Sequence, residues 1–231
     1  MIFNKNKENS MDLFLTKCLK LIFNVTDFVS GLYNNSFPEA YSYFYTQAST
    51  KETSSTPSEK EIIEISNLSN YIDKPLQLAV YNHPRLIREA LWFKERAAAF
   101  KIKLEIITYS FNDNFFTEKI MFDADMALAT DIPVTDIELG YFDFLLNKTL
   151  LFQKFVDKRQ LSIIHSLTEK YRSSIFPEQK AYLINEIENY ITQENILIYL
   201  YHPLKHYNIH SFINGVEFDS NGNIVLNKLW W

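Results

Sequence analysis

Three histidines spaced four residues apart, His202, His206 and His210, are the first candidates for chemistry in this sequence. On a helix, side chains four residues apart share one face, so this spacing would gather three imidazoles as metal ligands. Pro203 and the apolar stretch before it argue against a regular helix at this point. Structural zinc also requires four well-placed ligands. We therefore expect loop histidines here and no metal site.

Nucleophiles and paired carboxylates are sparse. Cys18 is the only cysteine and falls on an apolar helical stripe, which predicts a core thiol and excludes an intrachain disulfide. Asp123 and Asp125 would face the same side of a strand, but we expect Asp123 in the preceding loop. With four glycines, the chain offers no phosphate-cradling loop. The residues assemble no catalytic constellation, so we expect a protein that is not an enzyme and has no cofactor.

Charge and hydropathy exclude further classes of protein. The formal net charge is −5 and no run of Lys or Arg exceeds two residues, so the basic surface that nucleic-acid binding requires is lacking. The many aromatic residues, nineteen Phe and fourteen Tyr, predict a bulky aromatic core. No apolar stretch is long enough to span a bilayer, and the first ten residues lack the apolar region of a signal peptide. The sequence as it stands predicts a cytoplasmic location without membrane insertion.

A strand, a helix and a second strand follow one another in the middle of the chain. Residues 76–81 are apolar and predict a strand, and the Asn-His-Pro sequence after them opens a helix that keeps an apolar face to about residue 100. Residues 102–109 alternate like a second strand. Such a βαβ unit needs parallel strands joined by a right-handed crossover, so the predicted fold class is α/β.

Further elements are predicted on both sides of this unit. In chain order, they are a helix over 11–23, a solvated, mobile loop over about 47–60, a strand over 124–129, helices over about 137–156, 159–173 and 177–192, and a strand over 195–201 that Pro203 ends. The tail predicts a hairpin of 216–219 with 224–226 around Asn221-Gly222.

The ends of the predicted strands carry the candidate ligand-binding residues. Small ligands of open α/β sheets gather outside the carboxyl ends of the strands. The polar or aromatic residues expected there are Asn82, His83, Tyr109, Asp131 and Asp136. They would form the floor of half a cleft. In the alternative interpretation, Asn82 and His83 cap the helix that follows them, and Asp136 caps the next one.

Several short segments carry a resemblance to a known family. In chain order, they are Ile2-Phe3-Asn4, Asn24-Val25-Thr26-Asp27, Phe37-Pro38-Glu39-Ala40-Tyr41-Ser42, Tyr199-Leu200-Tyr201-His202 and the closing stretch from Val216-Glu217-Phe218 to Leu229-Trp230-Trp231. Together they resemble the second lobe and closing segment of family-5 extracellular solute-binding proteins, the oligopeptide- and nickel-binding type. Within that family, residues 124–128 and 136–145 are most similar to the binding-protein-like domain of SgrR-type transcriptional regulators.

The resemblance implies a periplasmic-binding-protein-like lobe with a mixed sheet flanked by helices. Residues 1–200 would form the second lobe, and residues 201–231 would return to a first lobe that is largely missing from this sequence. Asp131 is the position that corresponds to the family's ligand-facing acid. The transporter branch often carries a Trp shortly before it, where this chain has Leu128-Ala129-Thr130, so the resemblance does not extend to recognition of a peptide amino terminus.

The resemblance also implies a function. An SgrR-type protein is a cytoplasmic regulator, in which this module would sense a small solute, such as a sugar phosphate or a short peptide. It would touch DNA only through a domain absent from this chain. The alternative is a fragment of the solute-binding protein of an ABC transporter. In both cases, the expected protein partner is the missing first lobe or another chain that replaces it.

Overall fold

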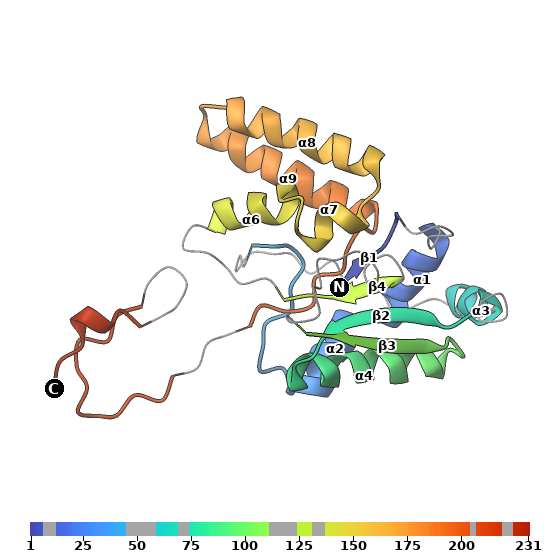
Figure 1. Ribbon diagram of the computed structural model, residues 1–231, viewed down its shortest axis with the longest axis horizontal. Coiled ribbons are helices and arrows are strands. Elements are labelled where there is room, and N and C mark those ends of the chain that lie inside the picture. The colour runs from blue at the N-terminus through green and yellow to red at the C-terminus, as the bar shows by residue number, and fades with distance from the viewer. Residues whose placement is uncertain are drawn as a thin grey trace.

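The computed structural model describes residues 1–6, 13–44, 59–68, 74–110, 124–130, 137–203, 207–218 and 224–231. One sheet lies between two layers of helices, and the C-terminal tail extends away from both layers (Figure 1). No helix among the described residues is long and apolar enough to cross a membrane. The layered arrangement confirms the predicted α/β fold class.

The sheet has the strand order β1-β4-β2-β3. Its strands are β1 (Ile2–Phe3), β2 (Leu76–Tyr81), β3 (Leu104–Tyr109) and β4 (Met126–Leu128). β2 runs parallel to both of its neighbours, with Leu78 opposite Ile106 of β3 and Met126 of β4, while β1 pairs antiparallel with β4. The sheet is therefore mixed, as predicted, and the strand predicted over 124–129 is confirmed in shortened form.

The βαβ unit is closed by α4 (Pro84–Ala99), which connects β2 to β3. Proline stands at the start of the helix, where the missing N–H costs no hydrogen bond. At the other end, Lys101 adopts a left-handed φ of 61° and Ile102 N–H donates to Ala97 O at 3.0 Å. This geometry favours glycine, and a lysine there costs about 1 kcal/mol in backbone strain.

Apolar side chains cover both faces of the sheet, as a sheet buried between helices requires. One face packs against α4, α1 (Leu13–Ile22) and α2 (Val25–Tyr33), and its core contains a cluster of aromatic rings. Phe28 stacks on Phe93 with ring centroids 5.0 Å apart, and Phe23 meets Phe93 edge-on at the same distance. This packing confirms the predicted aromatic core. A further helix, α3 (Glu59–Leu68), contacts α1.

The other face is covered by four helices: α6 (Ile137–Leu146), α7 (Leu151–Phe155), α8 (Lys158–Ser173) and α9 (Pro177–Gln193). α8 and α9 pack against each other (Figure 1). Asp157 caps α8 by accepting the N–H of Gln160 at 2.9 Å, and Asn195, with φ 48°, follows the end of α9. These two long helices begin and end within one residue of their predicted bounds.

Three predictions need correction. The helix predicted over 137–156 is two helices, because Asn147 accepts hydrogen bonds from both the N–H and the hydroxyl of Thr149 and so turns the chain. α2 was not predicted, although Asn24 caps it by accepting the N–H of Asp27 at 3.0 Å. Residues 59 and 60, expected in the loop, begin α3, and 47–58 lie outside the described residues.

The chain leaves this body along the edge of the sheet. Residues 196–201 are extended, and isolated bridges join Leu197 to Ile2 and Tyr201 to Glu39, where a regular strand was predicted. The tail then makes its own contacts: Phe218 bridges Ile224, and Asn214 bridges Trp230. The first bridge confirms the predicted hairpin pairing, while Leu226–Lys228 is a 3-10 turn. None of the described residues from 207 onward is buried.

Candidate functional site

The carboxyl ends of the three parallel strands lie at one edge of the sheet, where we expected the ligand-binding residues. Asn82 and His83 follow β2 directly, and Tyr109 ends β3. The backbone N–H of Asn82 donates to Tyr109 O at 2.7 Å and extends the pairing by one residue. Asp131 and Asp136 lie outside the described residues, so their place at this edge stays a prediction.

His83 has the capping role that was the alternative interpretation. Its backbone is extended, with φ −132°, and its Nδ1 accepts the N–H of Arg85 at 3.3 Å. The rest of the imidazole is exposed, as is the side chain of Asn82. Capping uses one ring nitrogen and leaves Nε2 facing solvent, so the cap and a role in binding are compatible.

Tyr109 lies in a different environment from the two residues beside it. It is buried, and its ring packs against Tyr81 with centroids 5.8 Å apart. Burial, with a smaller contribution from Tyr81, raises the pKa of Tyr109 to about 12. This hydroxyl is therefore protonated at neutral pH and does not act as a base.

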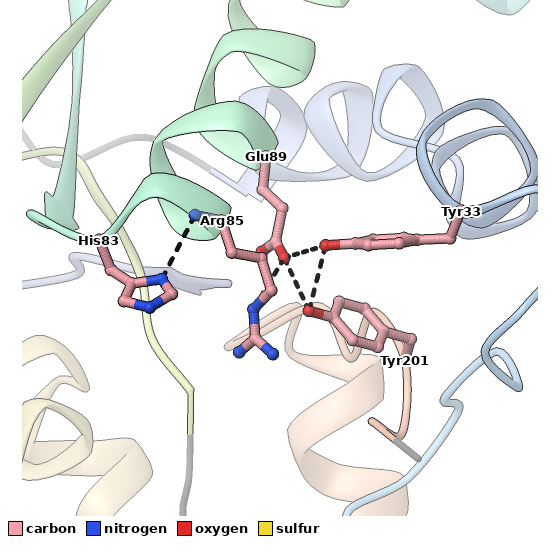
Figure 2. A network of polar contacts seen from close by, with 5 residues as sticks. All are labelled: Tyr33, His83, Arg85, Glu89 and Tyr201. Atoms are coloured by element: carbon pink, nitrogen blue, oxygen red, sulfur yellow. Dashed lines mark hydrogen bonds and ion pairs between the residues drawn. The ribbon is translucent and has the colours of Figure 1, made fainter. Parts of the chain in front are cut away.

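A buried carboxylate that the sequence analysis missed lies one helical turn after Arg85 on α4. Glu89 of α4 is 1% exposed and accepts hydrogen bonds on one oxygen, Oε1, from the hydroxyls of Tyr33 and Tyr201. The bond from Tyr201 measures 2.7 Å, and the two tyrosine oxygens are 3.4 Å apart (Figure 2). The signal for this residue was its spacing: Glu89 falls on the apolar face of the helix, between Leu86 and Phe93.

The two tyrosines act as permanent hydrogen-bond donors. Burial, followed by their bonds to one another and to Glu89, raises the pKa of Tyr201 far above its ordinary value, and burial raises that of Tyr33. The ring of Tyr201 also stacks on Phe37, with centroids 5.1 Å apart. These side chains enclose Glu89, which is buried in the core.

Arg85 connects this buried network to the surface. Its Nε lies 3.6 Å from Glu89 Oε1, an ion-pair distance too long for a hydrogen bond. This atom is buried and has no hydrogen-bond partner among the residues that the structure describes. The side chain as a whole is 34% exposed. Arg88, one turn along, lies over the ring of Tyr33 at 5.3 Å. The groups that can meet a ligand here are therefore cationic or neutral donors.

A second buried carboxylate lies on the opposite face of the sheet. Glu188 of α9 accepts the hydroxyl of Tyr199 at 2.9 Å and the N–H of Tyr43 at 3.0 Å. Burial raises the pKa of Glu188 above its ordinary value, and these hydrogen bonds oppose that shift. Like Glu89, this group is enclosed by aromatic side chains.

The other residues considered for chemistry have structural surroundings. Cys18, a residue of α1, is buried in the hydrophobic core. Asp125 Oδ2 accepts the backbone N–H of Gln77 at 2.8 Å. Burial lowers the pKa of His202, which follows the extended segment and is not helical. Among the residues that the structure describes, no group of three His, Cys, Asp or Glu side chains could hold a metal ion.

No model of a known family matches the sequence, and no curated protein matches it. Solved structures do. AppA, an oligopeptide-binding protein from Bacillus subtilis in complex with a nonapeptide, has a TM-score of 0.72 and 13% identity, and the match covers 99% of this chain and 49% of AppA. DppA, an ABC transporter-associated periplasmic binding protein from Helicobacter pylori in complex with the peptide STSA, has a TM-score of 0.69, 14% identity, and coverage of 99% and 46%.

NikA from Staphylococcus aureus, in complex with Ni(L-His)2, is similar in the same way. Its TM-score is 0.69 at 14% identity, and the match covers 96% of this chain and 48% of NikA. The chain spans about half the length of the solved proteins that it matches. With the mixed sheet and its flanking helices, these likenesses show that the chain has the fold of about half of a family-5, peptide- or nickel-type solute-binding protein.

Proposed function

We propose that this chain is a non-enzymatic solute-binding module, one half of a cleft that closes over a small solute. The observation that carries the proposal is the match of almost the whole chain to about half of each binding protein, with TM-scores near 0.7. The edge formed by Asn82, His83 and Arg85 supplies the floor of the cleft. The ligand class is a short peptide or a comparably small polar solute, because the matched structures hold peptides and a nickel–histidine complex.

We propose a role in transport ahead of a role in transcriptional regulation. DppA, whose fold it shares, is an ABC transporter-associated binding protein. The interpretation as the sensor domain of an SgrR-type cytoplasmic regulator rests on the sequence resemblance alone. The coding sequence upstream of this chain separates the two: a signal with a lipid-attachment cysteine supports transport, and a winged helix supports regulation.

We further propose that residues 201–231 pack against the other half of the cleft, whether that half is a first lobe or a separate chain. The tail exposes several large apolar side chains, namely Phe212, Phe218, Leu226, Trp230 and Trp231. An apolar surface of this kind marks an interaction site. Closure between two such halves would couple ligand binding to a change of shape.

Binding of defined solutes tests the proposal. The chain is titrated by calorimetry with the peptide STSA, with a nonapeptide pool and with Ni(II)–histidine. Where the upstream coding sequence contains a first lobe, the titrations are repeated after co-expression with it. We expect saturable binding without cleavage of the peptides. Asp131→Asn should weaken this binding, whereas Asp143→Asn, which changes an exposed side chain of α6, should not. Turnover of a peptide that is lost in Asp131→Asn or Asp136→Asn would contradict the non-enzymatic assignment.

A further inference from the structure

Arg85 occupies an unusual position for an arginine. It stands in the first turn of α4, shortly after the carboxyl end of β2, and its backbone N–H donates to His83 Nδ1. Figure 2 shows its side chain running past Glu89, with the two terminal nitrogens at the end that points away from the carboxylate. The guanidinium is thus held at the candidate ligand edge, with its outer end directed away from the buried network.

Glu89 does not satisfy this guanidinium. Its Oε1 already accepts both tyrosine hydroxyls, and Arg85 Nε remains 3.6 Å away. A bidentate pair, in which two parallel N–H groups meet two carboxylate oxygens, is therefore not formed. Buried donors without an acceptor are costly and rare in native proteins, and Arg85 Nε is one of them among the described residues.

The surroundings favour a ligand that brings negative charge. Arg85 lies at the N-terminal end of α4, where the helix dipole favours anions. His83 adds a donor: since its Nδ1 accepts a hydrogen bond, the proton of the neutral ring belongs on Nε2, which faces solvent. An arginine fork beside such a donor matches the oxygens of a carboxylate or a phosphate.

We propose that Arg85, assisted by His83, binds an anionic oxygen group of the solute, either a carboxylate or a phosphate. Glu89, Tyr33 and Tyr201 are positioning residues in this site: the buried carboxylate holds the guanidinium by charge without occupying its outer nitrogens. The inference rests on the proposed solute-binding function, because it assigns part of the ligand to this edge of the sheet.

Small anions test the site without knowledge of the full ligand. The ¹⁵N-labelled chain is titrated with inorganic phosphate and separately with acetate, at constant ionic strength, and amide shifts are followed by NMR. We expect saturable shifts centred on residues 83–89. A response to phosphate alone assigns a phosphate group, and a response to acetate assigns a carboxylate. Shifts scattered over surface lysines, with none near Arg85, would overturn the proposal.

Three variants separate bidentate hydrogen bonding by the guanidinium of Arg85 from the effect of its positive charge alone. Arg85→Gln should weaken anion binding by about tenfold or more, the equivalent of one charge-assisted hydrogen bond. Arg85→Lys keeps the charge and should still lose several-fold, because a lysine cannot bind bidentately. Lys94→Gln, which changes an exposed cation more than two turns further along α4, should leave the affinity within about twofold, as expected for a distant surface charge. Equal affinities of the wild type and Arg85→Gln would refute the site.

The outcomes for the site and for the proposed function are distinguishable. If STSA binds the wild type and Arg85→Gln equally, the module binds solutes but not through Arg85. If phosphate or acetate binding depends on Arg85 while no peptide or nickel–histidine complex binds, the anion site stands and the proposed ligand class fails. The shifts in the wild-type protein decide the matter even if Arg85→Gln does not fold.

Discussion

Tyr199 and Tyr201 are two residues apart, yet their hydroxyls bind buried carboxylates on opposite faces of the sheet. Tyr199 donates to Glu188 of α9 at 2.9 Å, and Tyr201 donates to Glu89 of α4 at 2.7 Å. Leu200, which lies between them, packs in the same core as Tyr201, on the face of the sheet that α4 covers. The segment that leads into the tail is therefore fixed to both helical layers immediately before the chain leaves them.

Removing either hydroxyl should destabilise the protein. We expect Tyr199→Phe and Tyr201→Phe each to lower the free energy of unfolding by about 1.5–3 kcal/mol, the range for a hydrogen bond to a charged group. Urea unfolding followed by circular dichroism measures this. Tyr182→Phe is the matched control, because Tyr182 makes the same kind of bond to Glu186 at 3.1 Å on an exposed surface. That control should unfold at the same urea concentration as the wild type. A loss in Tyr182→Phe as large as in the buried pair would show that enclosure of the carboxylates contributes nothing.

Glu188 should make stability depend on pH in an unusual direction. Its pKa is raised above the ordinary value of 4.5, first of all by burial, so the folded protein retains a proton that the unfolded chain releases. The stabilising contribution is complete below pH 4.5 and is lost as the pH rises from there through the raised pKa. Glu188→Gln cannot titrate, and it should lose less stability than the wild type over this window.

Urea unfolding at a series of pH values measures the effect. Glu186→Gln, two residues earlier on the same helix and in contact with exposed Tyr182, is the control and should follow the wild-type profile. If the difference between Glu188→Gln and the wild type stays constant across the window, Glu188 does not carry a raised pKa in the folded protein.

Short-range features of this fold were readable in the sequence, and long-range ones were not. Pro84 after an apolar strand predicted the βαβ unit because proline, helix face and strand alternation are all local. The break at Asn147 depended on a side-chain turn inside an apolar run, which periodicity does not register.

The candidate site was predicted in part for the same reason. The strand ends at Asn82 and Tyr109 meet as expected. The partners of Glu89 lie 56 and 112 residues away in the sequence, in Tyr33 and Tyr201, so only the folded chain brings them together. The sequence did indicate that Glu89 needs partners. It lies on an apolar helix face, and a buried charge without partners is too costly.

His83 should separate into a capping role and a binding role. His83→Ser replaces the imidazole by a hydroxyl that also caps helices, so the free energy of unfolding should stay within about 0.5 kcal/mol of the wild type. His83→Ala lacks any cap and should lose about 1 kcal/mol. Both variants lose the exposed Nε2 and should bind phosphate or acetate more weakly. If His83→Ser binds anions as the wild type does, the imidazole is a cap alone.

The tail should be dispensable for folding but not for association. Trp231 is 95% exposed, Phe212 is 73% exposed, and the ion pair of Lys228 with Glu217 is itself at the surface. Since none of the described residues from 207 onward is buried, deletion of 207–231 removes little apolar contact with the body. We expect the free energy of unfolding to change by less than about 1 kcal/mol, as for other surface changes.

Sedimentation velocity tests the second half of this expectation. The full chain should self-associate with rising concentration, because exposed apolar surface of this kind promotes association, and the deletion should abolish that behaviour. A full-length variant with Phe212→Ser, Trp230→Ser and Trp231→Ser is the control that keeps the chain length, and it should behave like the deletion. A large loss of stability on deletion would mean that the tail packs against the body in solution, which would leave no surface for the other half of the cleft.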